Sequence, residues 1–265
     1  MISRDEVAAG MESLPSLSTA LADLLDSFDR DGVGISELVD GIGRDQGLSA
    51  RVLRVANSPF YGFSSRIGSI REAVVVLGFN TLRSIAVSSG LIDAFPGLDC
   101  RAFWQHGAGA GACARSIARK VGVNPEVAFV AGLLHDVGKL VFETKFGAEY
   151  AEAIEWAKRE DCEIRHAEKA LLGIDHAEIG FEVANRWKFP VAMQHAIRDH
   201  HDPQGEKLTD VVHLANALSH ALDLGHSGYD FVPPISHAAW QRLGLDFAWL
   251  KRCFGEVSAG GLPFP

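Results

Sequence analysis

The sequence lacks an apolar run long enough to cross a bilayer, which takes about 18 to 20 residues in a helix. Its longest candidate, Ile85–Leu91, is interrupted by serines and a glycine. The first residues, MISRDEVAAGMESLP, are polar and acidic and have no apolar core, unlike a secretory signal. These absences predict a cytoplasmic protein without a membrane partner.

Cysteine is scarce, and an excess of positive charge is missing. The four cysteines, Cys100, Cys113, Cys162 and Cys253, contain no CxxC pair. This spacing favours reduced, mostly buried thiols and argues against a zinc site built from cysteines. The net charge of −9 and the pI of about 5.6 argue against general binding to nucleic acid or to anionic membranes. We therefore expect no nucleic-acid partner.

Histidine is absent from the first part of the chain, because all 11 histidines lie at or after His106. Apolar residues recur in that part at helical spacing. From Leu14 to Leu25 they predict a helix in which Pro15 occupies the first turn and Ser13 is a candidate cap. The part contains no glycine-rich phosphate loop and no Ser/His/Asp arrangement, so we find no catalytic apparatus in it.

Three further features of this part allow more than one interpretation. The run Val74–Val76 admits a strand, but the flanking spacing and the stop at Gly78 favour a helix. We expect Phe60, Tyr61 and Phe63 to pack between lobes, the alternative being a partner-binding aromatic knob. The cations are almost all arginine and predict a solvated, salt-bridged surface, the alternative being a groove for an anion. These arginines are Arg44, Arg51, Arg54, Arg66, Arg71 and Arg83.

The rest of the chain is also helical by pattern. Residues 101–122 are rich in alanine and glycine, which suits close helix packing, and Asn124-Pro125 marks the start of the next helix. Residues 127–142 predict a buried helix that stops at Gly138, and residues 208–225 predict a long buried one. No segment alternates as a strand does, so the expected fold class is all-α.

The expected organisation has three parts. A multi-helix N-terminal lobe covers residues 1–99 and packs on a helical bundle of residues 100–255, which a tail of residues 256–265 follows. We expect Trp104 to join Phe60 and Tyr61 in the contact between the lobe and the bundle.

The candidate functional residues centre on the pair His135-Asp136 in GLLHDVGKL. An aspartate in an apolar helix is costly to bury unless it is paired or bound to a metal. Imidazole and carboxylate groups are ligands for divalent iron, manganese or zinc, and two ions bridged by a carboxylate would polarise a phosphate and generate a hydroxide. The candidate ligands are His106, His135, Asp136, His176, His200, His201 and Asn216.

These motifs resemble known families. GLLHDVGKL, an upstream histidine, a later HHDP and a final helix with a polar residue amid alanines resemble the HD superfamily of metal-dependent phosphohydrolases. The extra histidines resemble its HD-GYP branch, which cleaves cyclic di-GMP at a site with two or three metals. The whole chain is most similar to the HDOD family, the HD-related output domains of bacterial signalling. LPSLSTALADLL, DQGLSARVLRVANSPFYG, SIREAVVVLGFNTLRSIAV, WKFP and IRDHHDP carry that similarity over roughly residues 10–255.

The resemblance assigns roles to the candidate ligands. His106 matches the first histidine of the superfamily, and His135 with Asp136 matches its defining pair, Asp136 being the bridging ligand. Lys139 matches a lysine found near the phosphate, although a surface lysine is an equal interpretation. If the protein is an enzyme, Asp136 and Lys139 are its catalytic residues. His176, His200 and His201 match the further histidines of the HD-GYP branch.

Two departures separate the chain from active phosphohydrolases. Asn216 stands where active members place their last aspartate, and a neutral amide weakens a cationic site. DPQGEK follows the histidine pair in place of the GYP signature. On the helix of Asn216, His213 and His220 are alternative ligands. HDOD proteins are generally viewed as regulatory and as lacking phosphodiesterase activity.

Three functions remain open on the sequence alone. The first is a regulatory module of bacterial signalling, non-catalytic, that binds a partner signalling protein or a nucleotide and retains a metal. The second is a metal-dependent phosphodiesterase or phosphohydrolase acting on a cyclic dinucleotide or nucleotide. The third is an interaction scaffold without a metal. The intact cluster with the neutral Asn216 favours the first.

Overall fold

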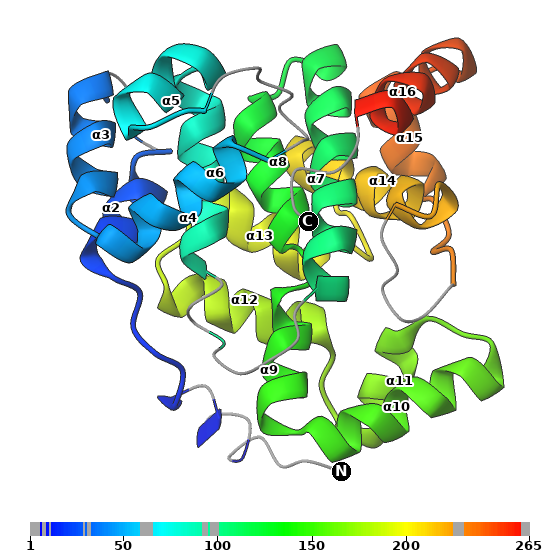
Figure 1. Cartoon of the computed structure of the whole chain (residues 1–265). Coiled ribbons are helices and arrows are strands. Elements are labelled where there is room, and N and C mark those ends of the chain that lie inside the picture. Colours follow the sequence, from blue (N-terminus) through cyan, green and yellow to red (C-terminus); the bar gives the residue numbers. More distant parts are fainter. Residues whose placement is uncertain are drawn as a thin grey trace.

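Every regular element that the structure describes is an α-helix (Figure 1). The structure is a computed structural model, and it describes residues 6, 9–10, 12–28, 30, 33–58, 66–91, 95, 101–224 and 231–260. Over these ranges no strand occurs, which confirms the all-α prediction. No helix in this described part combines the length and the apolar character that a membrane crossing requires.

Short helices build the N-terminal part. They are α2 (Thr19–Asp26), α3 (Ile35–Gly43), α4 (Gln46–Ala56), α5 (Ile70–Leu77) and α6 (Phe79–Leu91). The valine run lies in α5 and is helical as predicted, with Val74 buried while Val75 and Val76 face outward. The predicted start at Pro15 is wrong. The hydroxyl of Ser18 accepts the N–H of Leu21 and caps α2, so the helix begins at Thr19.

The C-terminal part contains the longer helices. They are α7 (Arg101–Val121), α8 (Pro125–Leu134), α9 (Val137–Lys145), α10 (Gly147–Glu160), α11 (Ile164–Leu171), α12 (His176–Arg186), α13 (Val191–Asp199), α14 (Lys207–Ala221), α15 (His237–Leu243) and α16 (Phe247–Gly260). The predicted start at Asn124 is confirmed, because its side chain caps α8. The boundaries 1–99, 100–255 and 256–265 stay predictions, and residues 261–265 lie outside the described residues.

The antiparallel pair α7 and α8 forms the centre of the molecule (Figure 1). Helix α6, from the N-terminal part of the chain, packs against α8, while α14 and α16 pack against α7. Small residues allow the two central helices to approach closely. A Cβ atom on Gly107 of α7 would lie only 2.5 Å from the carbonyl oxygen of Leu133 on α8. The alanine- and glycine-rich composition of residues 101–122 thus has the packing role that the sequence indicated.

Polar groups connect the two parts of the chain. The buried carboxylate of Glu126, on α8, accepts hydrogen bonds from Ser84 of α6 (3.2 Å) and from Arg115 of α7 (2.7 Å). Trp104 is buried against the ring of Phe103 at a centroid distance of 5.0 Å. Its predicted partners, Phe60 and Tyr61, lie outside the described residues, as does Phe63.

Arg83 corrects the expectation of a solvated arginine surface. Its side chain is buried, donates to the carbonyl oxygen of Ser27 at 2.7 Å, and lies 3.9 Å above the ring of Phe28. Burial lowers the pKa of Arg83. This arginine therefore joins α6 to the end of α2 inside the lobe. The burial of the thiols also matches expectation in the part described: Cys113 and Cys253 are buried and Cys162 is half-buried, whereas Cys100 lies outside it.

The predicted buried helix over residues 127–142 is two helices. α8 ends at Leu134, the chain turns at His135 and Asp136, and α9 begins at Val137. Gly138 lies inside α9 and does not stop a helix. A Cβ at this position would lie 2.0 Å from the carbonyl oxygen of His176. The glycine therefore permits contact between α9 and α12, and the turn before it directs His135 and Asp136 to the interior.

Candidate metal centre

The seven predicted ligands come from five places along the chain and meet in the interior. His106 comes from α7, Asn216 from α14, and His176 is the first residue of α12. His135 and Asp136 form the turn between α8 and α9, and His200 and His201 follow the end of α13. All are buried except His201, which is half-buried. The structure thus brings together residues that span positions 106 to 216.

Asp136 lies at the middle of the cluster with its two oxygens facing different histidines. Its Oδ1 is 3.2 Å from Nε2 of His176 and 3.7 Å from Nε2 of His200. Its Oδ2 is 3.4 Å from Nε2 of His135 and 3.7 Å from Nε2 of His106. Two groups of side chains can therefore each offer ligand atoms to a metal, one beside each oxygen of Asp136. The first group is His176, His200 and His201, and the second is His106, His135 and Asp136 itself.

The hydrogen bond that each Nδ1 atom makes on the side away from Asp136 determines which ring nitrogen faces the cluster. Nδ1 of His135 donates to the carbonyl oxygen of Gly132, and Nδ1 of His200 donates to that of Ile197, each at 2.7 Å. A carbonyl oxygen only accepts, so Nδ1 carries the hydrogen and Nε2 presents a lone pair. Neither Nε2 has a hydrogen-bond partner, although both are buried. Buried polar atoms without partners are rare in proteins, and these two fit a metal ion at the centre.

Electrostatics keeps most of the cluster in the state that metal binding requires. Burial lowers the pKa of His106, His135, His200 and His201, so these imidazoles are neutral at neutral pH. Burial opposes ionisation of Asp136, but the charge of Lys139 and the hydrogen bond from His176 hold the pKa of this carboxyl well below its usual range. Neutral imidazole and ionised carboxylate are the forms that bind metals.

His176 differs from the other histidines because a carboxylate stands behind it. Its Nδ1 donates to Oε2 of Glu168 at 2.6 Å, and its backbone N–H donates to the same oxygen. Burial opposes protonation, but Glu168 outweighs it and raises the pKa of His176 to about 9. Glu168 thus orients the ring and increases its basicity, as carboxylates behind metal-bound histidines do.

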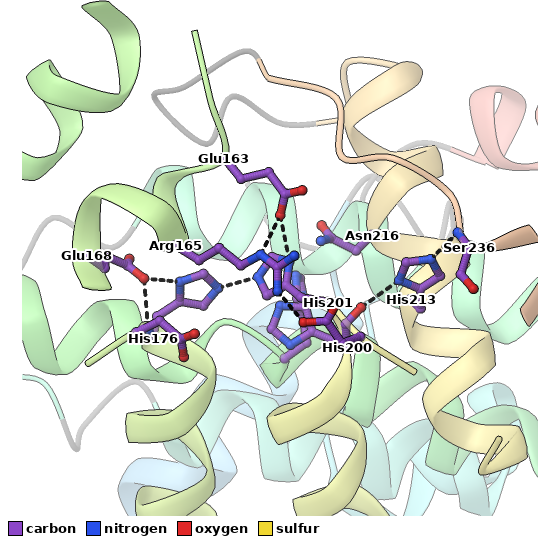
Figure 2. A network of polar contacts seen from close by, with 12 residues as sticks. Glu163, Arg165, Glu168, His176, His200, His201, His213, Asn216 and Ser236 are labelled. Atoms are coloured by element: carbon purple, nitrogen blue, oxygen red, sulfur yellow. Dashed lines mark hydrogen bonds and ion pairs between the residues drawn. The ribbon is translucent and has the colours of Figure 1, made fainter. Parts of the chain in front are cut away.

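Glu163 and Glu168 also belong to the site, although neither was among the predicted ligands. Figure 2 shows a chain of polar contacts from Glu168 through His176 and His201 to Glu163. Nδ1 of His201 lies 3.3 Å from Oε2 of Glu163, which is also 2.9 Å from Nε of Arg165. A signal for Glu168 existed: it follows Ile164 and Ala167 at helical spacing, on the buried face of α11. A carboxylate on the apolar face of a helix indicates that it has a buried polar or charged partner.

The alternative ligands on α14 differ from each other. Both ring nitrogens of His213 are occupied, since Nδ1 donates to the carbonyl oxygen of His200 and Nε2 accepts the N–H of Ser236 (Figure 2). It therefore supports the turn at His200 and has no lone pair for a metal. The ring of His220 lies 4.4 Å from that of His106 between centroids, at an interplanar angle of 45°, and burial lowers the pKa of His220 to about 4. Asn216 places its Oδ1 3.1 Å from Nε2 of His106.

A cleft opens beside the cluster. Its polar wall includes Asp136, Lys139 and His201, and the ammonium of Lys139 lies 2.6 Å from Oδ2 of Asp136. Its apolar wall is formed by Phe103, Tyr150, Ile154, Ile164, Phe231 and Pro233. The cluster is thus reachable from outside, and Lys139 belongs to it and is not a surface lysine.

The fold and the cluster define an all-helical protein with a buried His/Asp centre. The HDOD domain family matches residues 14–203, more than half of the chain. The chain therefore belongs to the HDOD family.

Solved structures with similar folds bear on this assignment. An HDOD domain protein of unknown function from Geobacter sulfurreducens is 28% identical, with a TM-score of 0.80 over 96% of this chain and 93% of its own. A phosphohydrolase candidate from Shewanella amazonensis SB2B is 27% identical, with a TM-score of 0.77 over 97% of this chain and 96% of its own. A signal transduction candidate from Marinobacter aquaeolei VT8 is 22% identical, with a TM-score of 0.80 over 97% and 62%, and shows likeness of fold alone.

A curated relative extends beyond the region it shares with this chain. An uncharacterized protein of Treponema pallidum (strain Nichols) is 26% identical over 236 residues, which cover 86% of this chain and 46% of the relative. The chain thus spans about half the length of that protein.

Proposed function

We propose that this protein is a regulatory HDOD module of bacterial signalling in which the His/Asp cluster binds a divalent ion of iron, manganese or zinc. The observation that carries the proposal is the buried Nε2 atom of His200, which lacks a hydrogen-bond partner and lies 3.7 Å from Oδ1 of Asp136. A partner signalling protein or a nucleotide would be the ligand of the module.

The ion would be held by imidazole nitrogens and by the carboxylate of Asp136, a ligand set that suits these metals. When bound, it would supply positive charge at the centre of the bundle and hold the ligating side chains together. Other residues of the chain orient the side chains that would bind the ion. Gly132, Ile197 and Glu168 orient the rings, and the joint arrangement ties α8, α9, α12 and α13 to one point.

Phosphohydrolase activity is the second candidate function. The cleft that reaches Asp136 and carries the ammonium of Lys139 favours it, since a cation beside a metal site suits a phosphate. Asn216 opposes it, because the neutral amide contacts His106 and adds no charge to the centre. No arginine lines the cleft among the described residues, which leaves few cations for a dinucleotide.

The first test is a count of metal in the untagged protein by elemental mass spectrometry. We expect about one equivalent or more, lost in His200→Ala and in Asp136→Asn. His166→Ala is the matched control, because the side chain of His166 is exposed on α11 and is not one of the clustered histidines. Less than about a tenth of an equivalent in the wild type after reloading would reject the metal site. Turnover of cyclic dinucleotides or nucleotide monophosphates by the loaded protein would favour the second candidate.

A further inference from the structure

The two oxygens of Asp136 have unlike neighbours, and the difference bears on how many ions the cluster can hold. We propose that it holds one ion, bound by His176, His200, His201 and Oδ1 of Asp136, and that the ammonium of Lys139 occupies the position of a second ion beside Oδ2. This inference rests on the proposed function and goes beyond it, because it assigns the stoichiometry and gives Lys139 a role.

The Oδ1 side is prepared for a cation. The far nitrogens of His176 and His200 donate to Glu168 and Ile197, and that of His201 faces Glu163. Each ring therefore turns its Nε2 inward. The Nε2 atoms of His176 and His201 are only 2.9 Å apart. Without an ion this distance is a hydrogen bond between the two rings, and a bound ion would take the place of the shared hydrogen.

The separations on this side fit one ion. Nitrogen and oxygen ligands lie about 2.0 to 2.2 Å from zinc, which places two ligands of a tetrahedral ion about 3.3 Å apart. The observed separations are 2.9 Å between His176 and His201, 3.2 Å between His176 and Asp136, and 3.7 Å between His200 and Asp136. Four protein ligands complete a tetrahedral shell and leave no position for water or substrate, as in structural sites.

The Oδ2 side has too few lone pairs for an ion. The ammonium of Lys139 is 2.6 Å from Oδ2, with the lysine one turn after Asp136 at the start of α9. Oδ1 of Asn216 accepts a hydrogen bond from Nε2 of His106 at 3.1 Å, so that nitrogen carries a hydrogen and cannot bind a metal. Of the two Nε2 atoms on this side, that of His135 is the one without a hydrogen-bond partner.

The lysine and the asparagine form a matched pair on this side. An ammonium neutralises Oδ2 without needing further ligands, whereas a second metal ion would need them. A neutral amide at position 216 is consistent with a lysine beside Asp136, because an added carboxylate there would call for a second divalent charge. The ammonium of Lys139 and the neutral amide of Asn216 thus have the same consequence, which is a cluster with a single ion.

The test is the number of ions per folded chain, measured by native mass spectrometry after loading with zinc. We expect one ion in the wild type, in His135→Ala and in the control Lys158→Met, whose lysine is exposed on α10. We expect two ions in the double variant Lys139→Met/Asn216→Asp and none in His200→Ala. Native spectra report only folded chains, so a misfolded variant is recognised by its charge states.

The outcomes separate this inference from the proposed function. No ion in the wild type would reject the proposed function. Two ions in the wild type, or loss of the ion in folded His135→Ala, would overturn the single-ion arrangement while leaving a metal site. One ion in the folded double variant would overturn the role of Lys139.

Discussion

At the scale of the residue, the partner of each ring nitrogen decides what a histidine does. His200 and His213 are both buried on neighbouring helices, yet only His200 has a free nitrogen directed at the cluster. His176 differs again, because Glu168 raises its pKa to about 9. The motif HHDP indicated the chemistry, whereas the state of each imidazole depends on acceptors elsewhere in the chain.

The charge of Glu168 predicts a pH-dependent stability in chelator-treated protein. His176 has an ordinary pKa of 6.5 when unfolded and about 9 when folded. The pair therefore contributes its full stability below pH 6.5 and loses it as the pH rises through 9. In Glu168→Gln the oxygen still accepts hydrogen bonds but the charge is gone. We expect this variant to be less stable than wild type by up to about 3 kcal/mol at pH 6.

Urea unfolding at pH 6, 7.5 and 9 checks this prediction. The difference between wild type and Glu168→Gln should shrink steadily from pH 6 to pH 9. Glu152→Gln, at an exposed position of α10, should show no such trend. A difference that stays constant over this range would show that Glu168 does not raise the pKa of His176.

At the scale of the element, the break between α8 and α9 produces the site. Apolar residues continue on both sides of His135 and Asp136 between Val127 and Phe142, so local sequence favours one helix. The turn at His135 and Asp136 forms because α9 must pack on α12, where Gly138 lies against the backbone of His176. Contact with a distant helix thus overrides the local preference and places both side chains inward.

Gly138→Ala tests this packing. The added Cβ would lie 2.0 Å from the carbonyl oxygen of His176 and 2.8 Å from the backbone nitrogen of Gly180, and backbone cannot yield cheaply. We expect a loss of about 2 to 4 kcal/mol in the free energy of unfolding. Gly147→Ala is the control, because its Cβ would meet nothing within 4 Å. Chemical denaturation of both variants gives the comparison, and equal stability would disprove the close contact.

At the scale of the whole molecule, the N-terminal lobe and the cluster share the central pair α7 and α8. Helix α6 packs on α8, while α7 and the end of α8 supply His106 and His135 to the cluster. Glu126 lies at the junction with Ser84 and Arg115 as its partners. Because one helix pair serves both sides, the parts of the chain should unfold together.

Glu126→Ala tests the junction. Removing the carboxylate leaves Arg115 without this partner inside the interface, although the guanidinium still lies 4.1 Å above the ring of Phe129. We expect the free energy of unfolding to fall by about 1 to 3 kcal/mol. Unfolding monitored by near-UV circular dichroism should still show a single transition. Ser84→Ala removes one weaker hydrogen bond and should cost less. Two separate transitions in Glu126→Ala would show that the lobe unfolds independently.

The sequence by itself determined the helical class, many helix ends and the identity of the seven clustered residues. These follow from local rules: periodicity marks helices, Asn124 caps α8, and imidazole with carboxylate indicates metal chemistry. The tertiary structure decided the break at His135, the burial of Arg83, and the roles of Glu168 and Lys139. Burial and hydrogen-bond partners arise from residues far apart in the chain, and only folding determines which of them meet.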